Sequence, residues 1–127
     1  MKKLLQTLAA LVFAISFSTT SVFAFSDSED HWAEYYIDEL AERNIVQGYE
    51  NNMFKPENFL TRAEMAKIAV LAFELELEND NEFKDVDPSL WYGEYVNTAA
   101  SHGVISGYKA ENGDETGYFG PENFITR

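Results

Sequence analysis

The sequence predicts an all-α protein built from two tandem helix–loop–helix units. The first observation is an internal repeat, because residues 56–62 (PENFLTR) return as residues 121–127 (PENFITR). The second is helical periodicity, because apolar residues recur three and four positions apart along residues 31–43. Self-similarity at a fixed spacing indicates stacked supersecondary units, so it outweighs local propensity in assigning the fold.

The repeat extends well beyond the duplicated heptapeptide. The other matching positions are Phe25 and Phe83, Asp27 and Asp85, Trp32 and Trp91, Tyr36 and Tyr95, Ile37 and Val96, Gly48-Tyr49 and Gly107-Tyr108, and Phe54 and Phe119. We assign residues 25–78 to repeat 1 and residues 79–127 to repeat 2, which is truncated before its second helix. The extra polar residues within 109–118 are expected to form a surface loop.

The first 24 residues have the layout of a secretory signal peptide. Lys2 and Lys3 precede an uncharged apolar run at residues 8–17, and residues 22–24 (VFA) offer small side chains for cleavage. The apolar run is too short for a bilayer span, which needs about 20 residues. The sequence therefore predicts export with no transmembrane segment, and a mature chain that begins at Phe25.

The composition narrows the class of partner. The formal net charge is −13, and the predicted signal peptide contributes two lysines and no acid, so the mature chain is more acidic still. Such acidity argues against nucleic acid and against an anionic membrane surface as partners. The chain has no cysteine, so its stability must come from core packing or association and not from disulfides.

The first helix of each repeat follows a polar entry. In repeat 1 we predict a helix at about residues 31–43, with N-caps available in residues 27–30 and stop signals at Asn44 and Gly48. A short apolar plug at residues 45–46 and a loop at 49–58 follow. In repeat 2 the matching helix is predicted at residues 90–101, after an acidic linker at residues 79–87.

The second helix of repeat 1 is predicted to begin at a capping box. The Thr61 hydroxyl can accept from the backbone N–H of Glu64, whose carboxylate can reach back to the N–H of Thr61. The helix continues to Leu75 and is apolar nearly all the way round, so we expect burial on more than one side. Thr126 begins the matching box in repeat 2, which is incomplete.

Arg62 is the residue that helix stability does not explain. It occupies the first helical turn, where the macrodipole disfavours cations, and repeat 2 has Arg127 at the matching place. One interpretation is a surface salt bridge to Glu57 or Glu64. The other is a guanidinium beside free helix N–H groups, which together form an anion site suited to a carboxylate.

The density of aromatic residues in repeat 1 also admits two interpretations. Aromatic side chains at helical spacing are usually core residues, and Tyr36 fits that pattern. Trp32 lies at the helix start and Tyr49 follows a turn glycine, so either could form a flat wall against a sugar face.

The combined pattern resembles the S-layer homology (SLH) domain. The residues that carry the resemblance are His31-Trp32-Ala33, Gly48-Tyr49, Phe54-Lys55-Pro56 and Thr61-Arg62-Ala63-Glu64. The resemblance covers one complete repeat and most of a second. It implies an all-helical, three-pronged bundle, usually of three repeats, which would be incomplete in a chain with two.

The resemblance also implies a function, which is non-catalytic anchoring to secondary cell-wall polysaccharide, often pyruvylated, at the bacterial surface. In the family the arginine of the capping motif contacts the glycan, which carries over to Arg62 and Arg127. The resemblance also implies glycan contact at the matching aromatic positions, which are Trp32, Trp91, Tyr49 and Tyr108. Further SLH repeats in cis, or self-association, would complete the grooves, and no cofactor or metal is implied.

Three alternatives belong to other classes. The first is that the sequence is the N-terminal fragment of a larger S-layer protein or surface glycoside hydrolase whose main activity lies downstream. A hydrolase using Glu34 and Asp38 is weakly supported, because these acids fall on a solvent-facing helical face and His31-x-x-Glu34 lacks the second histidine of a zinc site. Calcium binding is the third, by Asp80, Glu82, Asp85 and Asp87, although this run lacks the glycine and terminal glutamate of an EF-hand loop.

Overall fold

The computed structural model describes residues 25–80 and 83–125, and within them the fold is helical. The elements are α1 (Glu34–Glu42), the short 3₁₀ helix η1 (Glu50–Asn52), α2 (Arg62–Ala72) and α3 (Gly93–Ser101). The described residues contain isolated β-bridges but no β-strand. The predicted all-α class is therefore confirmed. The predicted signal peptide, Glu82, Thr126 and Arg127 lie outside the described residues.

The first helix of each repeat begins later than the sequence predicted. α1 starts three residues after His31 and α3 three residues after Leu90, because the chain first forms tight turns. In repeat 1 these turns are held by bonds from His31 N to Ser28 O (3.0 Å) and from Glu34 N to His31 O (2.9 Å). Residue Ala33 is the N-cap of α1 and provides no side-chain cap. The prediction of an N-cap within residues 27–30 is wrong.

All three helices end in the same hydrogen-bonded motif. In α2 the Leu75 N–H donates to Val70 O at 3.0 Å and the Glu74 N–H donates to Leu71 O at 3.3 Å. This pair of bonds is a Schellman motif, which requires a left-handed residue just after the helix. That residue is Glu74 in α2, with φ 53°, and Asn44 and Gly103 occupy the same place after α1 and α3.

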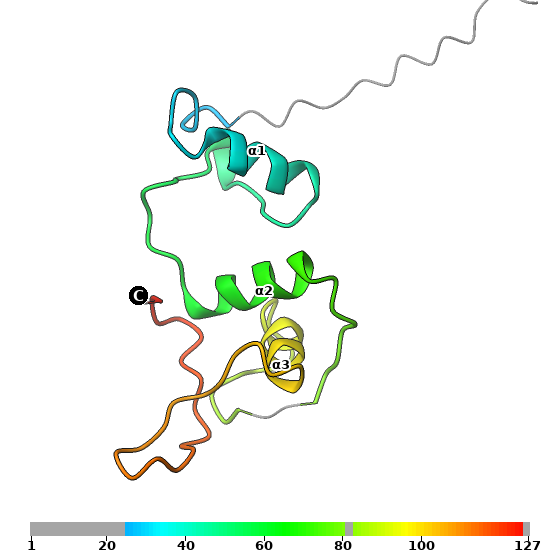
Figure 1. Ribbon diagram of the computed structural model, residues 1–127, viewed down its shortest axis with the longest axis vertical. Coiled ribbons are helices and arrows are strands. Elements are labelled where there is room, and N and C mark those ends of the chain that lie inside the picture. The colour runs from blue at the N-terminus through cyan, green and yellow to red at the C-terminus, as the bar shows by residue number, and fades with distance from the viewer. Residues whose placement is uncertain (1–24, 81–82, 126–127) are drawn as a thin grey trace, which may run out of the picture.

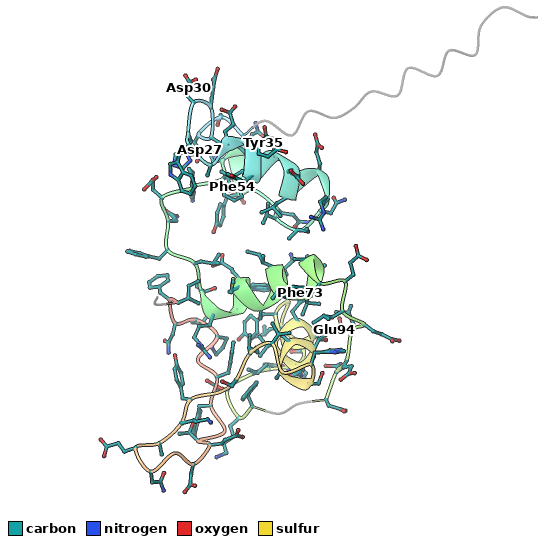
Figure 2. All side chains as sticks on the ribbon, viewed as in Figure 1. Asp27, Asp30, Tyr35, Phe54, Phe73 and Glu94 are labelled. Carbon is teal, nitrogen blue, oxygen red and sulfur yellow. The ribbon has the colours of Figure 1, made fainter. Side chains whose placement is uncertain are left out.

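The two repeats fold through matching contacts. The Asp27 carboxylate accepts from the backbone N–H groups of Phe54 and Lys55, both at 2.7 Å. Asp85 accepts from those of Phe119 (2.8 Å) and Gly120 (2.7 Å) in the same way. The rings of Phe25 and Phe54 lie 5.3 Å apart, as do those of Phe83 and Phe119. Figure 2 shows Asp27 and Phe54 beside α1. Each aspartate thus ties the start of its repeat to the loop that precedes the duplicated heptapeptide.

The glycine of each Gly-Tyr pair is required by close packing. A Cβ at Gly107 would lie 2.8 Å from both the Phe83 ring and the Tyr118 carbonyl oxygen. A Cβ at Gly48 would meet the Phe25 ring and lie 2.8 Å from the Met53 carbonyl oxygen. The glycines therefore let the chain pass directly over a core phenylalanine.

The hydrophobic core is divided into two clusters. The smaller cluster consists of Phe25, Ile37 and Ala41, with partly buried neighbours such as Val46 and Phe54. The larger cluster combines α2 and α3 with residues from the loops of repeat 2; its buried members are Ala63, Ala66, Val70, Phe83, Val86, Tyr92, Val96, Ala99 and Phe119. Although α2 belongs to repeat 1 in sequence, it therefore lies in the core of repeat 2.

Figure 1 shows the resulting arrangement, with α2 packed against α3 and α1 on the opposite side of α2. Among the described helices, α1 packs directly against neither α2 nor α3. The buried residues of α2 fall on one face, whereas Met65 and Phe73 are exposed. Apart from Met65, the remaining residues of α2 are half-buried, so the prediction that this helix is buried on more than one side is confirmed in part.

The connecting segments differ from the predictions in one place. Residues 109–115 are exposed and form a loop that extends away from the helices in Figure 1, as expected from their polar composition. The predicted acidic linker at residues 79–87, however, contributes Phe83 and Val86 to the larger core cluster. Its apolar residues are therefore structural, and Asp85 is half-buried, whereas Asp80 and Asp87 are exposed.

Candidate functional site

The capping box at the start of α2 is present. Thr61 Oγ1 accepts from the backbone N–H of Glu64 at 3.2 Å, and Glu64 Oε2 accepts from the backbone N–H of Thr61 at 2.8 Å. Glu64 Oε2 also accepts from the Thr61 hydroxyl at 2.9 Å. This reciprocal pair fixes where the helix begins, and it thereby fixes the position of Arg62.

Arg62 binds repeat 2. Its Nε donates to Phe119 O at 2.8 Å, and its Nη2 donates to Ser106 O at 2.9 Å. The guanidinium carbon lies 4.3 Å from the centroid of the Phe119 ring and 4.8 Å from that of the Tyr108 ring. These contacts combine charge-assisted hydrogen bonds with cation–π attraction. Arg62 and Tyr108, both predicted glycan contacts, are therefore brought together.

The predicted salt bridge of Arg62 is absent from the described residues. Glu57 instead contacts His31, with 2.8 Å between Oε1 and Nε2. Glu64 is engaged by the capping box and by the Tyr49 hydroxyl, which donates to Glu64 Oε1 at 3.1 Å. The interpretation of Arg62 as a partner of Glu57 or Glu64 is wrong.

The N–H groups at the start of α2 are also occupied. The backbone N–H of Arg62 donates to Asn123 O at 2.8 Å, and that of Ala63 donates to Pro121 O at 3.0 Å. The Ile125 N–H donates to Leu60 O at 2.9 Å. The expectation of free helix N–H groups beside the guanidinium is therefore wrong, because the carbonyls of repeat 2 have taken them.

These bonds place the two copies of the duplicated heptapeptide side by side. Thr61 and Phe124 form an antiparallel bridge, and the rings of Phe59 and Phe124 lie 5.6 Å apart. In Figure 1 the C-terminal segment runs next to the first turn of α2. The repeated segment is therefore a structural contact between the repeats, in addition to being a helix start.

Within residues 25–80 and 83–125, two groups at the Arg62 site can take a further hydrogen bond. Among the described residues, Nη1 of Arg62 has no hydrogen-bond partner, whereas Nε and Nη2 are both engaged. The Tyr108 hydroxyl, which accepts from Asn123 Nδ2 at 3.0 Å, belongs to the same cluster. The arrangement can offer one guanidinium nitrogen and one phenol to a polar ligand.

A second arrangement lies between α1 and α2. Side chains from both elements and from their connecting loops line a groove of about 520 Å³. Tyr49 of repeat 1 and Trp91 of repeat 2 both border it, with 47% and 55% of their surfaces exposed. We call this cavity the Tyr49–Trp91 groove. It brings together two more of the predicted contacts, and Arg62 is not among its lining residues.

Two lysines that the sequence analysis did not single out also border this groove. Lys55 Nζ lies 4.6 Å from the centroid of the Tyr49 ring. Lys67 Nζ lies 5.8 Å from the centroid of the Trp91 ring and 5.6 Å from that of Tyr95. Lys67 could have been noticed in the sequence. It lies one helical turn after Glu64, at the usual position of an ion-pair partner, and the capping box binds the Glu64 carboxylate to Thr61 instead.

Burial and charge keep the Tyr49 hydroxyl protonated. Its partial burial, followed by the nearby negative charge of Glu64 and the hydrogen bond between them, raises the pKa of Tyr49 above its ordinary value. Tyr49 therefore stays a neutral hydrogen-bond donor to Glu64 throughout the physiological pH range.

Trp32 lies apart from the other predicted contacts. It is 81% exposed, its ring centroid is 5.5 Å from that of His31, and it does not line the Tyr49–Trp91 groove. Arg127, the sixth predicted contact, lies outside the described residues.

Three of the acidic residues considered for other chemistry, Glu34, Asp85 and Asp87, have structural partners, whereas Asp38 Oδ1 is buried with no hydrogen-bond partner among the described residues. Glu34 Oε2 accepts from the backbone N–H of Asp30 at 3.0 Å. Asp85 holds the backbone of Phe119 and Gly120, and Asp87 Oδ1 accepts from the Ser89 hydroxyl at 2.7 Å. Within the described ranges, no group of three His, Cys, Asp or Glu residues is arranged to hold a metal ion. No helix in the same ranges is long and apolar enough to cross a membrane.

Comparison with known proteins identifies related sequences. A family model described as the S-layer homology domain matches residues 24–66 and 82–127. The Cellulosome-anchoring protein of Acetivibrio thermocellus is 33% identical over 114 residues, which cover 84% of this chain and 24% of that protein. The Surface-layer 125 kDa protein of Lysinibacillus sphaericus is 32% identical over 96 residues, covering 76% and 8%.

Enzymes are also among the relatives. The Exoglucanase XynX of Acetivibrio thermocellus is 34% identical over 84 residues, which cover 65% of this chain and 8% of the enzyme. The chain therefore spans only a small part of the length of the relatives that it matches.

Proposed function

Because this chain belongs to the S-layer homology domain family, we propose that it is a non-catalytic module that anchors an exported protein to bacterial cell-wall polysaccharide. Two relatives are named as an anchoring protein and as a surface-layer protein, which supports a location at the cell surface. The exoglucanase shares 8% of its length with this chain, so we place the activity in its name outside the shared segment.

A second candidate is a larger product that contains this module. In that case the chain is the N-terminal part of an S-layer protein or of a surface glycoside hydrolase. The relatives include both kinds of protein, and each extends far beyond the matched residues. The reading frame that follows Arg127 in the genome distinguishes this candidate from a stand-alone anchor.

The observation that carries the proposal is the Tyr49–Trp91 groove. It has walls from both repeats, and its two aromatic rings are each about half exposed. Aromatic faces beside polar groups are suited to the apolar face and the hydroxyl rim of a pyranose ring. A polysaccharide lying in this groove would contact repeat 1 through Tyr49 and repeat 2 through Trp91.

The Arg62 site is proposed as an additional glycan contact. Nη1 can donate to an anionic oxygen, such as the carboxylate of a pyruvate ketal, beside the Tyr108 hydroxyl. By its matching position we propose the same role for Arg127 in repeat 2. Trp32, with its highly exposed ring, is proposed as a more distant sugar contact.

The three-pronged bundle and its further repeats also belong to the proposal. Met65 and Phe73 are 42% and 67% exposed, and Figure 2 shows Phe73 at the C-terminal end of α2. Exposed apolar side chains on a helix that already packs on one face are suited to another helix. We propose that a further SLH repeat in cis, or a second copy of the chain, covers this face.

A sedimentation assay on purified cell walls tests the anchoring role. The chain is mixed with walls of the bacterium that encodes it, either intact or stripped of their secondary polysaccharide by hydrofluoric acid. We expect the chain to sediment with intact walls and to stay in solution with stripped walls. Equal sedimentation with both preparations would contradict polysaccharide binding.

A pair of aromatic variants tests the groove in the same assay. Trp91→Ala should lower the affinity for walls roughly 10-fold, because packing of a sugar ring against the Trp91 indole contributes on the order of 1 to 2 kcal/mol. Phe73→Ala is the matched control, since it removes an exposed aromatic side chain that does not line the groove. If both variants bind as the original chain does, the groove is not the glycan site.

A further inference from the structure

We infer that the rings of Trp32 and Tyr36, at the start of α1, form a binding site for a sugar that carries a free, positively charged amino group. The inference rests on the proposed polysaccharide binding and deepens it, because it names the chemical class of one sugar in the ligand. Neither residue lines the Tyr49–Trp91 groove. The site is therefore separate from the groove.

The matching pair of rings in repeat 2 already holds an ammonium group. Trp91 and Tyr95 occupy in repeat 2 the places of Trp32 and Tyr36. Lys67 Nζ lies 5.8 Å from the centroid of the Trp91 ring and 5.6 Å from that of the Tyr95 ring. Both distances fall within the reach of cation–π attraction, which extends to about 6 Å. A Trp–Tyr pair at this place in the repeat can therefore bind a primary ammonium group.

The backbone that carries the two pairs is the same in both repeats. α1 and α3 each begin two residues after their tryptophan. The turn before α1 is closed by the Glu34 N–H, which donates to His31 O at 2.9 Å, and the turn before α3 by the Gly93 N–H, which donates to Leu90 O at 3.0 Å. Both pairs of side chains are therefore attached to the same local backbone geometry.

In repeat 1 the pair of rings has no cation. Within residues 25–80 and 83–125, no lysine or arginine lies over the ring of Trp32 or Tyr36. Trp32 is 81% exposed and Tyr36 is 60% exposed, against 55% for Trp91. The ring faces are therefore accessible to a cation that a ligand brings.

The charge of α1 is complementary to such a ligand. α1 carries four acidic residues at places where α3 carries neutral ones; the matching pairs are Glu34 and Gly93, Asp38 and Asn97, Glu39 and Thr98, and Glu42 and Ser101. α3 has a single acid, Glu94. The helix whose rings already hold a lysine thus lacks these acids, whereas the helix with the open rings has them. This distribution attracts a cation to α1.

Glu39 is the carboxylate best placed to assist the rings. It is exposed and lies one helical turn after Tyr36. A hydrogen bond between Tyr35 (Figure 2) and Glu39, followed by the negative charge of Glu39, raises the pKa of Tyr35 above its ordinary value. Tyr35 therefore stays a neutral donor at physiological pH. An ammonium group over Tyr36 would meet the ring face and the Glu39 carboxylate together.

Two basic side chains near the pair do not oppose this binding. The His31 ring lies 5.5 Å from the Trp32 ring. Its Nδ1, however, accepts from the Ala33 N–H at 3.1 Å, so the imidazole is neutral in this arrangement. Arg43 follows Tyr36 by two helical turns, about 10 Å along the axis. At that separation its repulsion is largely screened at physiological ionic strength.

An amino sugar fits this surface better than a simple amine. The exposed Trp32 indole offers a flat face to the apolar side of a pyranose ring. An amino group at the edge of that pyranose can then lie over Tyr36. A small polyamine would use only the charge of the site and would leave the indole face without a partner.

Binding of two matched tetrasaccharides tests the inference. The probes are the β-1,4-linked tetramers of glucosamine and of N-acetylglucosamine, which differ only in the acetyl groups that remove the charge. The titration is followed by NMR at about pH 6, where the amine is protonated and the carboxylates are ionised. We expect the original chain to bind the glucosamine tetramer about 5-fold more tightly, with a large shift of the Trp32 indole N–H.

Four substitutions complete the test. Trp32→Ala should bind both tetramers with the same weak affinity, and Glu39→Gln should lose part of the preference for glucosamine. Trp91→Ala removes the matching tryptophan of repeat 2, and Glu42→Gln removes another exposed acid of the same helix. Both of these controls should keep the preference of the original chain, and circular dichroism checks that every variant is folded.

Three results would overturn the amino-sugar site. The first is equal binding of both tetramers by the original chain. The second is a preference for glucosamine that survives in Trp32→Ala. The third is displacement of the glucosamine tetramer by an equal concentration of 1,4-diaminobutane, which would show that the site takes a polyamine and not a sugar.

The outcomes also separate this site from the anchoring role. If the chain sediments with intact walls but shows no preference between the tetramers, the site is overturned and the anchoring role stands. If the preference is present and depends on Trp32, but the chain stays in solution with intact walls, the anchoring role is contradicted and the site stands.

Discussion

At the scale of single residues, Arg62 resolves an apparent conflict with helix electrostatics. A cation in the first turn faces the positive end of the macrodipole. Its side chain, however, extends from the helix to two backbone carbonyl oxygens, at 2.8 and 2.9 Å, and to the faces of Phe119 and Tyr108. The partial negative charge of these groups offsets the unfavourable position.

We expect these contacts of Arg62 to stabilise the packing of repeat 2 against the start of α2. Arg62→Ala should lower the free energy of unfolding by about 2 to 4 kcal/mol, because two charge-assisted bonds and the ring contacts are lost. Arg62→Lys keeps the charge but not the fork, so its loss should be smaller than that of Arg62→Ala. Urea denaturation measures both. An unchanged midpoint for Arg62→Ala would show that these contacts do not hold repeat 2.

Protonation of the Asp27 carboxylate should make the free energy of unfolding depend on pH. Hydrogen bonds from the backbone N–H groups of Phe54 and then Lys55 lower the pKa of Asp27 below its ordinary value of 3.8. A group whose pKa is lowered by folding contributes stability above its unfolded pKa and loses that contribution as the pH falls through its folded pKa. The stabilisation by Asp27 should therefore be complete near pH 6 and fade below about pH 4.

The comparison of Asp27→Asn with the original chain measures this contribution. The difference in unfolding free energy between the two should be largest near neutral pH and should shrink as the pH falls through the folded pKa of Asp27, which lies below 3.8. Glu29→Gln, at an exposed position two residues away, is the control for a general loss of negative charge. A difference that stays constant with pH would contradict the assigned hydrogen bonds.

At the scale of elements, the C-terminal end of α2 contains a residue in an unfavourable backbone conformation. Glu74 occupies the left-handed position of the Schellman motif with φ 53°, where residues other than glycine and asparagine are disfavoured by about 1 kcal/mol. Glu74→Gly should therefore raise the free energy of unfolding by roughly 0.5 to 1 kcal/mol. Thermal denaturation measures the effect, and Glu76→Gly, outside this motif, should give no gain. A destabilised Glu74→Gly variant would show that the glutamate side chain makes a compensating contact.

The elements also show which features could be predicted from sequence. The capping box of Thr61 and Glu64 depends on residues three positions apart, and the internal repeat matches Asp27 with Asp85. Both features could therefore be predicted from the sequence. The helix starts were missed because turns held by backbone bonds precede α1 and α3, with no side-chain signal. A local pattern cannot distinguish these turns from the first turn of a helix.

The candidate site was only partly predictable, because its contacts are long-range. The motifs identified Tyr49, Trp91, Arg62 and Tyr108. They did not show that Arg62 and Tyr108 form one site whereas Tyr49 and Trp91 line the groove. Arg62 meets Tyr108 only because the loop of repeat 2 folds back over the start of α2. The contact of Lys67 with the rings of Trp91 and Tyr95 could be noticed only when the structure placed its ammonium group beside them.

At the scale of the whole molecule, the two repeats share elements. α2 follows α1 in sequence but packs with α3 in the larger core cluster. The smaller cluster around α1 lies on the other side of the groove. The groove is therefore formed between two cores, and its width depends on the loop that joins α1 to α2. A ligand that contacts both walls should order them relative to each other.

Chemical-shift mapping of the ¹⁵N-labelled chain tests whether wall polysaccharide binds in the Tyr49–Trp91 groove. On titration with the purified polysaccharide, we expect the largest amide shifts at Gly48, Tyr49, Lys67 and Trp91, with smaller shifts around Arg62. Shifts confined to the outer surface of α1 or to the exposed loop at residues 109–115, with the groove amides unmoved, would contradict binding in the groove.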